Sequence, residues 1–560
     1  MHLPLLFLLT VGGALAQPVM EFDIVVYGAS PAGIAAAITA ANTTGLRVAL
    51  LEPSPYIGGM AGPGGIGLRD TASPAGAVTG GPRSVMAHWL ALIRSQYSPA
   101  TNAVRQPDAN VSMAMWDTLV ARPAYNLTVV RNAALDEAPG AVQREGTSLV
   151  SMRTVDARDG VTNPTVWRAK FFIDATYEAD LVMASGASWT LGREARSQYG
   201  EFIAGILPNP SFQRFQYAVD PFWPNGTLLD GVEPSSNMPP AGAADDRVMP
   251  SSYRACLTND PSLRVPWPRP PGYSADQFEL LLRLAEKTGN TTFSHYVGIY
   301  PYYGYPASPS RPMKYDLCEN SELSTDQPSH MYTDYVRGNR TVRARVREAV
   351  KNWVQGWAYT LANHPRVPAG TRSSVSSYGL CKDAFVDSGH WPLQMYVREG
   401  VRLVGDYVAT QVNTITGECV PRSIGLGAWS IDIHLMRRFN GTRGGQPSTE
   451  NEGQVGFQAF PGKGTVYELP LEVILPKRAE VGNLAAPVTP SASHVAFGSM
   501  RVEPIFLALG TAAGAASAVA IRAGVPALQD VEIADVQEAL SQADQCFHWN
   551  TTGVQCQASC

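Results

Sequence analysis

The sequence FDIVVYGASPAG, residues 22–33, places an apolar run directly before a glycine turn. The small-residue run 34–38 follows at once, so the order predicts a strand, a tight turn and a helix. Gly28 permits the turn, Gly33 lets the helix pack close to the strand, and Pro31 suits the first helical turn. The N–H groups and the dipole at the start of such a helix attract a pyrophosphate. This segment therefore predicts a nucleotide-binding turn.

A second strand and an acidic residue complete this unit. The apolar run 46–51 predicts a buried parallel strand, and Glu52 ends it. An acid about 20 residues beyond the glycines accepts hydrogen bonds from the ribose hydroxyls of an adenosine. Ser30 replaces the middle glycine of the usual G-x-G-x-x-G motif, so an ordinary small-residue turn and a solvated glutamate are the alternatives. Because strand, turn, helix, strand and acid occur in this order, we favour the nucleotide interpretation.

The composition fits a large, loop-rich enzyme. The chain has 560 residues, which suffices for two domains, and 45% of them are hydrophobic. Its formal net charge is −5 and it has no long basic run, which argues against a nucleic-acid partner. Charged residues make up 16% of the chain, beside 51 glycines and 43 prolines, a balance that favours an extracellular enzyme over a helical bundle.

The N-terminus predicts export. Residues 3–11 form a short apolar core, and Ala14 and Ala16 place small residues at the two cleavage-site positions. We interpret residues 1–16 as a secretory signal peptide. The alternatives are an apolar strand and a membrane anchor, but the run is too short to cross a bilayer, and we expect no later segment to do so.

Glycosylation sequons and cysteines agree with the secretory pathway. The seven cysteines are expected to pair in an oxidising compartment and leave one over, with the pairing itself open. None of their spacings resembles a zinc site or a redox pair, so no metal site is predicted. The tail with Cys546, Cys556 and Cys560 predicts a small stapled extension. Eight acceptor sequons begin at Asn42, Asn110, Asn126, Asn225, Asn290, Asn339, Asn440 and Asn550.

The fold class is predicted to be α/β. Glycine density in residues 57–67 favours close approach of backbone to a ligand, although a surface loop is the alternative. Apolar runs between 127 and 176 predict a β-meander that returns to a parallel strand. We divide the chain into a signal peptide (1–16), the N-terminal part of a nucleotide-binding domain (20–200), a mixed α/β cap or substrate domain (201–390), a mixed connecting region (391–480), the C-terminal part of the nucleotide-binding domain (481–525) and a cysteine-containing tail (526–560).

The expected cap is rich in proline and aromatic residues. Two roles are open for the aromatic residues: they line a substrate pocket, or, as is more common, they pack in the hydrophobic core. Ser274 and Gln277 predict a capping box before a helix over 278–284, and residues 346–363 predict another helix. Further on, residues 483–488 read as a strand, 491–504 as a connector and 505–523 as a small-residue helix. Gly524 ends that helix. The N-terminus of the helix carries partial positive charge and is a second place where an anionic group can bind.

These blocks together resemble the FAD-dependent oxidoreductase family of the glutathione-reductase-like (two-dinucleotide) flavoproteins. Members often have Ser or Thr at the position of Ser30. The resemblance implies a Rossmann-like FAD-binding domain, assembled from the N-terminal segment and the C-terminal helix, and bound FAD. It runs from about residue 22 to 524, through blocks at 25–33, 58–60, 172–181, 192–195, 199–201, 396–400, 423–427, 467–470 and 483–514.

The resemblance also implies site residues. By analogy, the turn before the C-terminal helix faces the flavin pyrimidine edge, where Arg501 stabilises negative charge; pairing of Arg501 with Glu503 or the pyrophosphate is the alternative. His494 is the candidate proton acceptor, and a backbone-bonded histidine is the alternative. Secondary candidates for substrate contact are His390, His434, Arg398 and Glu399. The expected cofactor-binding residues are Gly28, Ser30, Pro31, Ala32, Gly33, Glu52, Gly58, Gly59, Met60, Leu135, Asp174 and Glu503.

The resulting functional hypothesis is a secreted FAD-dependent oxidase or dehydrogenase of a small organic metabolite. Hydride passes to FAD, and O2 or a diffusible acceptor reoxidises the flavin. A tailoring step in the synthesis of a natural product is compatible with this chemistry. The two rivals are an NAD(P)-dependent dehydrogenase, which needs no C-terminal helix, and a catalytically silent extracellular flavin-binding protein.

Overall fold

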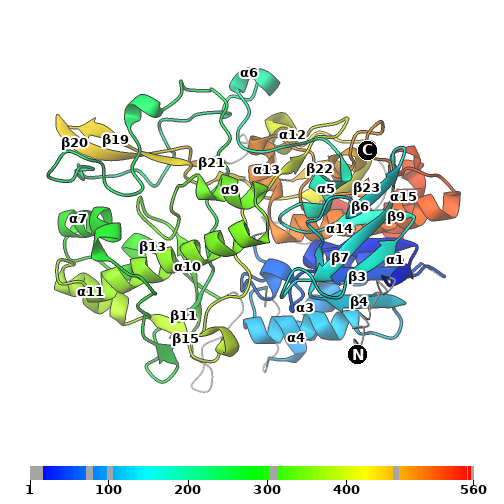
Figure 1. The fold of residues 1–560 in the computed structure, drawn as a ribbon, viewed down its shortest axis with the longest axis horizontal. Coiled ribbons are helices and arrows are strands. Elements are labelled where there is room, and N and C mark those ends of the chain that lie inside the picture. Colours follow the sequence, from blue (N-terminus) through cyan, green and yellow to red (C-terminus); the bar gives the residue numbers. More distant parts are fainter. Residues whose placement is uncertain are drawn as a thin grey trace, which may run out of the picture.

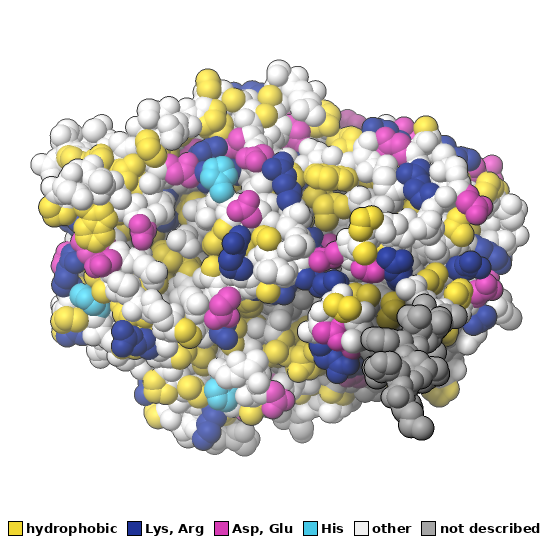
Figure 2. Space-filling view, in the orientation of Figure 1, with side chains coloured by type: hydrophobic (Ala, Val, Ile, Leu, Met, Phe, Trp, Pro, Cys, Tyr) yellow, Lys and Arg dark blue, Asp and Glu magenta, His cyan; other side chains and the backbone are white. Residues whose placement is uncertain are grey.

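A computed structural model describes residues 17–550 and 553–555, except 44, 71–77, 79, 98–104, 303–311 and 458–465. The predicted signal peptide, residues 1–16, lies outside the described residues. In Figure 1 the chain forms two lobes, one built on the N-terminal and C-terminal segments and one built on the middle of the chain. On the face in Figure 2, Lys and Arg side chains are interspersed with Asp and Glu.

The first lobe is built on a parallel five-stranded sheet with the strand order β23-β9-β2-β3-β4. In the register of this sheet, Tyr27 at the end of β2 lies between Leu51 of β3 and Asp174 of β9. Strand β23 comes from the far end of the sequence and pairs with β9. The nucleotide-binding sheet is therefore discontinuous in sequence. Its strands are β2 (Ile24–Tyr27), β3 (Val48–Glu52), β4 (Leu127–Arg131), β9 (Phe171–Asp174) and β23 (Leu484–Ala485).

Two helices of small residues, α1 (Pro31–Ala41) and α14 (Glu503–Ala523), pack against each other beside this sheet (Figure 1). A Cβ on Gly510 would lie 2.1 Å from the carbonyl oxygen of Ala32, and one on Gly514 would lie 2.3 Å from that of Ala36. The glycines thus allow backbone-to-backbone contact that any side chain would prevent.

Helix α14 ends at Gly524, whose φ of +68° gives the left-handed cap predicted from the sequence. By length and composition α14 meets the requirement for a membrane span, which we expected no later segment to meet. Of its apolar window, 94% is buried inside the protein, and within the described residues it is the single helix that passes this test.

The predicted meander forms a second sheet in the order β1-β8-β7-β5, with β6 paired to β7. Strands β1 and β8 are parallel, and the other pairs are antiparallel. This sheet brings the loops after β5 and β7 toward the nucleotide-binding sheet. Its strands are β1 (Val19–Glu21), β5 (Ala133–Leu135), β6 (Val142–Glu145), β7 (Ser148–Asp156) and β8 (Thr165–Arg168).

The second lobe is the mixed α/β cap, built on an antiparallel sheet in the order β12-β15-β11-β14-β13. The aromatic side chains Trp267, Phe293 and Trp357 are buried core residues, which confirms the core interpretation for these three, whereas Tyr300 is 40% exposed. The elements are β11 (Cys256–Thr258), β12 (Arg264–Val265), β13 (Val297–Pro301), β14 (Tyr315–Glu319), β15 (Gly379–Cys381), α7 (Glu279–Thr288), α8 (Phe293–Tyr296), α9 (Met331–Arg337), α10 (Arg340–Asn363) and α11 (Ala369–Ser376).

The remaining helices and strands connect these lobes or extend them. They are η1 (Gly59–Ala61), α3 (Val85–Ser95), α4 (Ala109–Val120), α5 (Asp180–Ser185), β10 (Trp189–Thr190), α6 (Arg196–Tyr199), η2 (Ser235–Asn237), η3 (Ala275–Phe278), η4 (Val386–Ser388), β16 (Arg402–Leu403), α12 (Gln411–Thr416), β17 (Ser423–Gly427), β18 (Ile431–Ile433), β19 (Arg437–Arg443), β20 (Gln446–Glu452), β21 (Val455–Phe457), β22 (Tyr467–Pro470), η5 (Leu471–Ile474), α13 (His494–Met500), η6 (Leu528–Asp530), α15 (Ile533–Gln542), β24 (His548–Asn550) and β25 (Gly553–Gln555).

Two local predictions were wrong. The expected connector over 491–504 contains the helix α13, which begins after Ser493, whose Oγ accepts a hydrogen bond from the N–H of Ala496 at 3.1 Å. Ser274 caps the 3-10 turn η3 by accepting from the N–H of Asp276, so α7 begins later, at Glu279, without that capping box. In both cases small polar residues had two local bonding choices, and the tertiary contacts selected one.

The cysteines follow the oxidised pattern. Cys256 and Cys381 form a disulfide between the adjacent strands β11 and β15. Cys419 and Cys546 each take part in a disulfide, whereas Cys318 is buried and carries a free thiol. Cys556 and Cys560 lie outside the described residues.

Candidate functional site

A cavity of about 1260 Å³ opens at the carboxyl ends of β2, β3 and β9. Its floor includes the predicted residues Gly28, Ser30, Glu52 and Gly59. This edge of an open parallel sheet is where nucleotide cofactors bind. The volume exceeds that of ordinary small-molecule pockets, which hold ~300–1,000 Å³, and suits a long ligand.

The glycine turn at the cavity floor has the geometry that the sequence predicts. Gly28 has a φ of +97°, and a Cβ there would lie 2.6 Å from the carbonyl carbon of Ala175. A Cβ on Gly33 would lie 1.8 Å from the carbonyl oxygen of Gly28. Both positions therefore exclude any side chain, and the backbone of the turn is left open toward the cavity.

Ser30 has a structural reason to replace the middle glycine of the motif. Its Oγ donates to the carbonyl oxygen of Ala175 at 2.8 Å and accepts from the N–H of Gly33 at 3.3 Å. The hydroxyl thus caps α1 and ties the helix start to the end of β9. The departure from G-x-G-x-x-G is a capped version of the same turn.

Glu52 ends β3 with its carboxylate at the cavity. One oxygen accepts from the N–H of Ala29 at 2.7 Å and the other from the N–H of Ser54 at 2.8 Å. Burial raises the pKa of Glu52, whereas these two hydrogen bonds lower it. Burial has the larger effect, and the pKa is about 7. The carboxylate is fixed where an adenosine ribose can donate to its remaining lone pairs.

We expect Glu52→Gln to weaken FAD binding at least tenfold at pH 8. The substitution removes a charge-assisted acceptor, worth about 1.5–3 kcal/mol, while keeping the side-chain size. Flavin fluorescence on dilution of the holoprotein measures the dissociation constant. Glu145→Gln, on the exposed strand β6, is the matched control. Equal affinities for Glu52→Gln and wild type would place the ribose elsewhere.

The predicted cofactor residues divide into two groups. Those at the cavity wall are Gly28, Ser30, Glu52, Gly59 and Leu135. The others shape the wall from behind: Asp174 accepts from the N–H groups of Thr176 and Val182 and so fixes the turn after β9. The remaining members of this second group are Pro31, Ala32, Gly33, Gly58, Met60 and Glu503.

The cap contributes a residue to this cavity that sequence reasoning missed. Arg340, at the start of α10, donates to the carbonyl oxygens of Leu135 at 3.0 Å and Gly160 at 3.2 Å. Its backbone N–H donates to Glu137 Oε1 at 2.6 Å. These partners line the same cavity. Arg340 thus joins the cap to the meander across the cavity. A local sequence pattern does not predict this contact because about 200 residues separate the partners.

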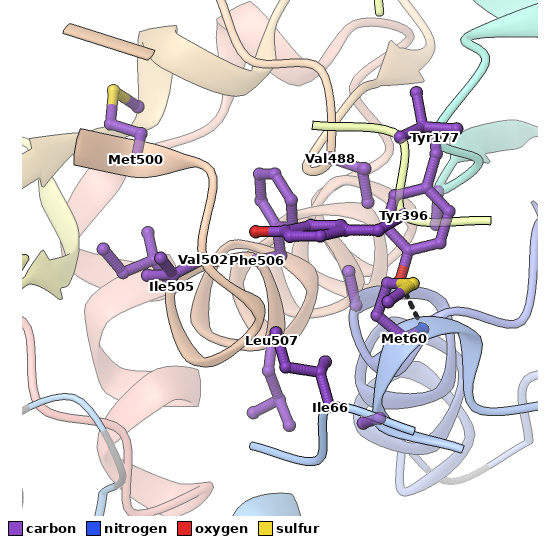
Figure 3. Close-up of a cluster of buried hydrophobic side chains, with 14 of the residues drawn as sticks. Met60, Ile66, Tyr177, Tyr396, Val488, Met500, Val502, Ile505, Phe506 and Leu507 are labelled. Atoms are coloured by element: carbon purple, nitrogen blue, oxygen red, sulfur yellow. Dashed lines mark hydrogen bonds between the residues drawn. The ribbon is translucent and has the colours of Figure 1, made fainter. Parts of the chain in front are cut away.

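Beyond Gly59 the wall continues into a buried cluster at the start of α14 (Figure 3). The hydroxyl of Tyr177 accepts from the N–H of Met60 at 2.9 Å and donates to Glu503 Oε1 at 2.7 Å. Tyr396 lies beside Tyr177 and directly follows the cavity residue Met395. The cluster therefore joins the cavity to the turn between α13 and α14.

Arg501 occupies that turn and is buried. It donates to the hydroxyl of Tyr396 at 2.9 Å and to Asp432 Oδ2 at 2.9 Å. It therefore pairs with Asp432 and not with Glu503, the alternative considered from the sequence. Burial lowers the pKa of Arg501, but the neighbouring Tyr396 and Asp432 raise it by more. The pKa therefore lies above its usual value, and the guanidinium is a permanent cation.

Two secondary candidates, Arg398 and His434, belong to the same buried network. Arg398 pairs with Glu319 at 2.6 Å and Asp326 at 3.0 Å, and His434 Nδ1 lies 2.7 Å from Asp326 Oδ2. Burial and Arg398 oppose the charge on His434, but the carboxylates around it, Glu319 first, raise its pKa. Glu319, Asp326 and His434 lie as close as metal ligands do. Arg398 already supplies a cation that pairs with both carboxylates.

His494 lies in a second buried cluster at the start of α13. Its Nδ1 is 2.8 Å from Glu399 Oε1, and its backbone N–H donates to Glu194 Oε2 at 2.9 Å. Arg402 pairs with both glutamates. His494 Nε2 is buried and has no hydrogen-bond partner among the described residues.

The catalytic candidates thus fall into separate places. Arg501, Arg398 and His434 come together, while His494 and Glu399 form the neighbouring cluster. His390 lies apart in the loop after η4, with Nδ1 3.2 Å from the carbonyl oxygen of Ala384.

A family model described as FAD dependent oxidoreductase matches residues 23–540. The chain belongs to this family. It is an FAD-dependent oxidoreductase, and FAD is its cofactor. The alternative of an NAD(P)-dependent dehydrogenase is therefore wrong. The discontinuous sheet and the packing of α14 on α1 agree with this conclusion, because that alternative needs no C-terminal helix. No curated protein sequence matches the chain.

Several solved structures are similar to parts of this chain. The L-proline dehydrogenase from P. horikoshii is 17% identical over 32% of this chain and 26% of its own, with a TM-score of 0.17. A myxobacterial chondrochloren halogenase is 19% identical over 31% and 41%, with a TM-score of 0.21. A glycerol-3-phosphate dehydrogenase from Bacillus halodurans, complexed with FAD, is 13% identical over 32% and 41%, with a TM-score of 0.21. The chain thus spans less than half of each.

The residues of the cavity fit FAD. The glycine turn is a cradle that a Cβ would fill. It lies between Glu52, which accepts from the N–H of Ala29, and the Gly58–Gly59 segment, where the N–H of Gly58 donates to the carbonyl oxygen of Ala29 at 2.8 Å. This order matches the order of ribose, pyrophosphate and ribityl groups along the cofactor. Glu503, which is bonded to the cavity residue Tyr177, has a buried Oε2 without a hydrogen-bond partner in the described residues.

Proposed function

We propose that this protein is a secreted FAD-dependent oxidase or dehydrogenase of a small organic metabolite, of the glutathione-reductase-like type. One observation carries the proposal. The cavity wall at Met395 continues into Tyr396, whose hydroxyl binds the buried cation Arg501 at the start of α14. A cofactor in the cavity would therefore point its redox-active end toward a fixed positive charge.

When bound, FAD supplies the acceptor for a hydride. The role of Arg501 and of the α14 start is to stabilise the negative charge that follows, because both are positive and fixed in place. The substrate loses a hydride and a proton. We assign proton acceptance to His494, whose Nδ1 is held by Glu399 and whose Nε2 is available. His434, held by Asp326, is the second candidate.

In the proposed cycle O2 takes two electrons and two protons and leaves as hydrogen peroxide, or a diffusible acceptor takes the electrons. This choice follows from the secretory assignment, because nicotinamide cofactors are scarce outside cells. The disulfide between Cys256 and Cys381 supports that assignment. So do six sequon asparagines with exposed side chains: Asn42, Asn110, Asn126, Asn225, Asn290 and Asn339.

The two other sequons differ. Asn440 is half-buried, and its limited exposure disfavours modification there. The side chain of Asn550 lies outside the described residues. We therefore propose that glycans, where present, lie at the exposed positions other than Asn339, which lines the cavity.

A substrate screen on purified holoprotein tests the proposal. Alcohols, amines, sugars and aromatic metabolites are offered while oxygen uptake, dye reduction and bleaching of the flavin band are followed. We expect one class to bleach the flavin and to form one hydrogen peroxide, or one reduced dye, per substrate. His494→Asn is expected to slow bleaching at least 100-fold while FAD stays bound. Flavin that dithionite reduces but that no metabolite reduces would favour a catalytically silent flavin-binding protein.

A further inference from the structure

Glu503 is a buried acid with one free end. It is the first residue of α14 and is 6% exposed. Its Oε1 accepts from the hydroxyl of Tyr177, while its Oε2 is buried and has no hydrogen-bond partner within the part of the chain that the structure describes. A buried polar atom without a partner is costly, about 1–3 kcal/mol, and therefore indicates a missing ligand.

Glu503 reaches the cofactor cavity through Tyr177. Tyr177, which holds Glu503, lines the cavity together with Gly59. Figure 3 shows the Tyr177 phenol reaching the backbone of Met60. A Cβ on Gly59 would lie 2.4 Å from the Tyr177 hydroxyl, so this glycine is required for the phenol to reach Met60 and Glu503. Along the wall, this point comes after the turn at Gly28 that faces the pyrophosphate. The next part of FAD is the ribityl chain, which carries hydroxyl groups.

We propose that Glu503 is a neutral hydrogen-bond donor to the ribityl chain of FAD, and that Tyr177 holds it in that role. Tyr177 donates to Oε1, which assigns the proton of the acid to Oε2, the oxygen with no other partner among the described residues. A neutral acid also adds no negative charge beside the pyrophosphate. The inference depends on FAD binding and not on the substrate proposed above.

The charged surroundings support a neutral Glu503. Burial raises its pKa to about 8, the Tyr177 hydrogen bond lowers it and Asp70 raises it. Two further titratable groups lie near the Tyr177–Glu503 pair: Glu178, which raises the pKa of Tyr177, and the phenol of Tyr396 beside Tyr177. At neutral pH Glu503 is therefore mostly protonated, and it ionises as the pH rises through about 8.

The test compares FAD with ADP, which lacks the ribityl chain. Fluorescence of FAD released on dilution of the holoprotein gives its dissociation constant, and competition by ADP gives the second constant. The wild-type FAD constant divided by the Glu503→Gln constant is expected to rise about tenfold from pH 7 to pH 9, as one ionisation near 8 requires. In Glu503→Gln the pH-dependent weakening of FAD binding that this ionisation causes disappears. The dissociation constant of ADP equals that of wild type at each pH. Dividing the wild-type values by the Glu503→Gln values removes the separate titration of Glu52.

Tyr177→Phe is the second variant. It removes the bond that lowers the pKa of Glu503, so the pH midpoint of FAD release should move upward. The proposal is overturned if Glu503→Gln keeps the wild-type pH profile, or if it weakens ADP and FAD equally. An unchanged or lower midpoint in Tyr177→Phe overturns it as well, even if Glu503→Gln fails to fold. Failure to oxidise any metabolite leaves these results unaffected.

Discussion

Gly33→Ala is expected to give a protein without bound flavin. The added Cβ would stand 1.8 Å from the carbonyl oxygen of Gly28, a backbone atom that cannot rotate away. The helix α1 must then move off β2, which opens the pyrophosphate turn. We expect FAD affinity to fall more than 100-fold, and the free energy of unfolding to fall by about 3 kcal/mol or more, at or above the usual range for overpacking. Flavin absorbance and urea unfolding measure the two effects.

Gly226→Ala is the control for Gly33→Ala. Gly226 has a φ of +83° and nothing within 4 Å of a built Cβ, so the change adds backbone strain without a clash. It should retain full flavin and lose about 1 kcal/mol. If Gly33→Ala bound FAD as well as Gly226→Ala does, the turn would not be the pyrophosphate site.

Arg398→Met is the second substitution with a large expected effect. The guanidinium is fully buried and pairs with Glu319 and Asp326. Removing it leaves buried carboxylates without their cation, which typically destabilises by about 3–5 kcal/mol. Urea unfolding at pH 7 measures this loss. Arg345→Met, on the exposed side of α10, is the control and should change stability by less than about 0.5 kcal/mol.

The pH dependence of this loss has a defined sign. Although burial raises the pKa of Glu319, Arg398 and His434 hold it below the usual range. A carboxyl with a lowered pKa stabilises the fold above its unfolded pKa, and that stability is lost as the pH falls. The deficit of Arg398→Met should therefore shrink below about pH 4.5. A deficit that is small at pH 7, or that grows in acid, would contradict the ion-pair account.

The first domain was predictable from sequence because its determinants are local. Gly28, Gly33 and Glu52 lie within one strand–helix–strand unit, and the small residues of α14 reveal its close packing before the partner helix is known. The family match and the fold agree with these predictions. Ser30 shows the limit of the motif, since its capping role depends on Ala175, a residue that the local pattern does not include.

The rest of the site could not be predicted because its contacts are non-local. Arg340 reaches Leu135 across 205 residues, and Tyr177 reaches Glu503 across 326. Asp174 was expected at the cofactor, but its carboxylate is used by the turn that follows β9. Helix α13 was read as a connector because small and polar residues favour several local structures. Charge pairs such as that of Arg501 with Asp432 appear only once the two lobes are assembled.

The cofactor content of the purified protein tests the central claim most directly. Protein recovered from a secreting host is denatured, and the released cofactor is separated and identified. The account predicts one FAD per chain in wild type and none in Gly33→Ala. A folded wild-type protein that releases no flavin, or that releases a nicotinamide dinucleotide, would contradict it.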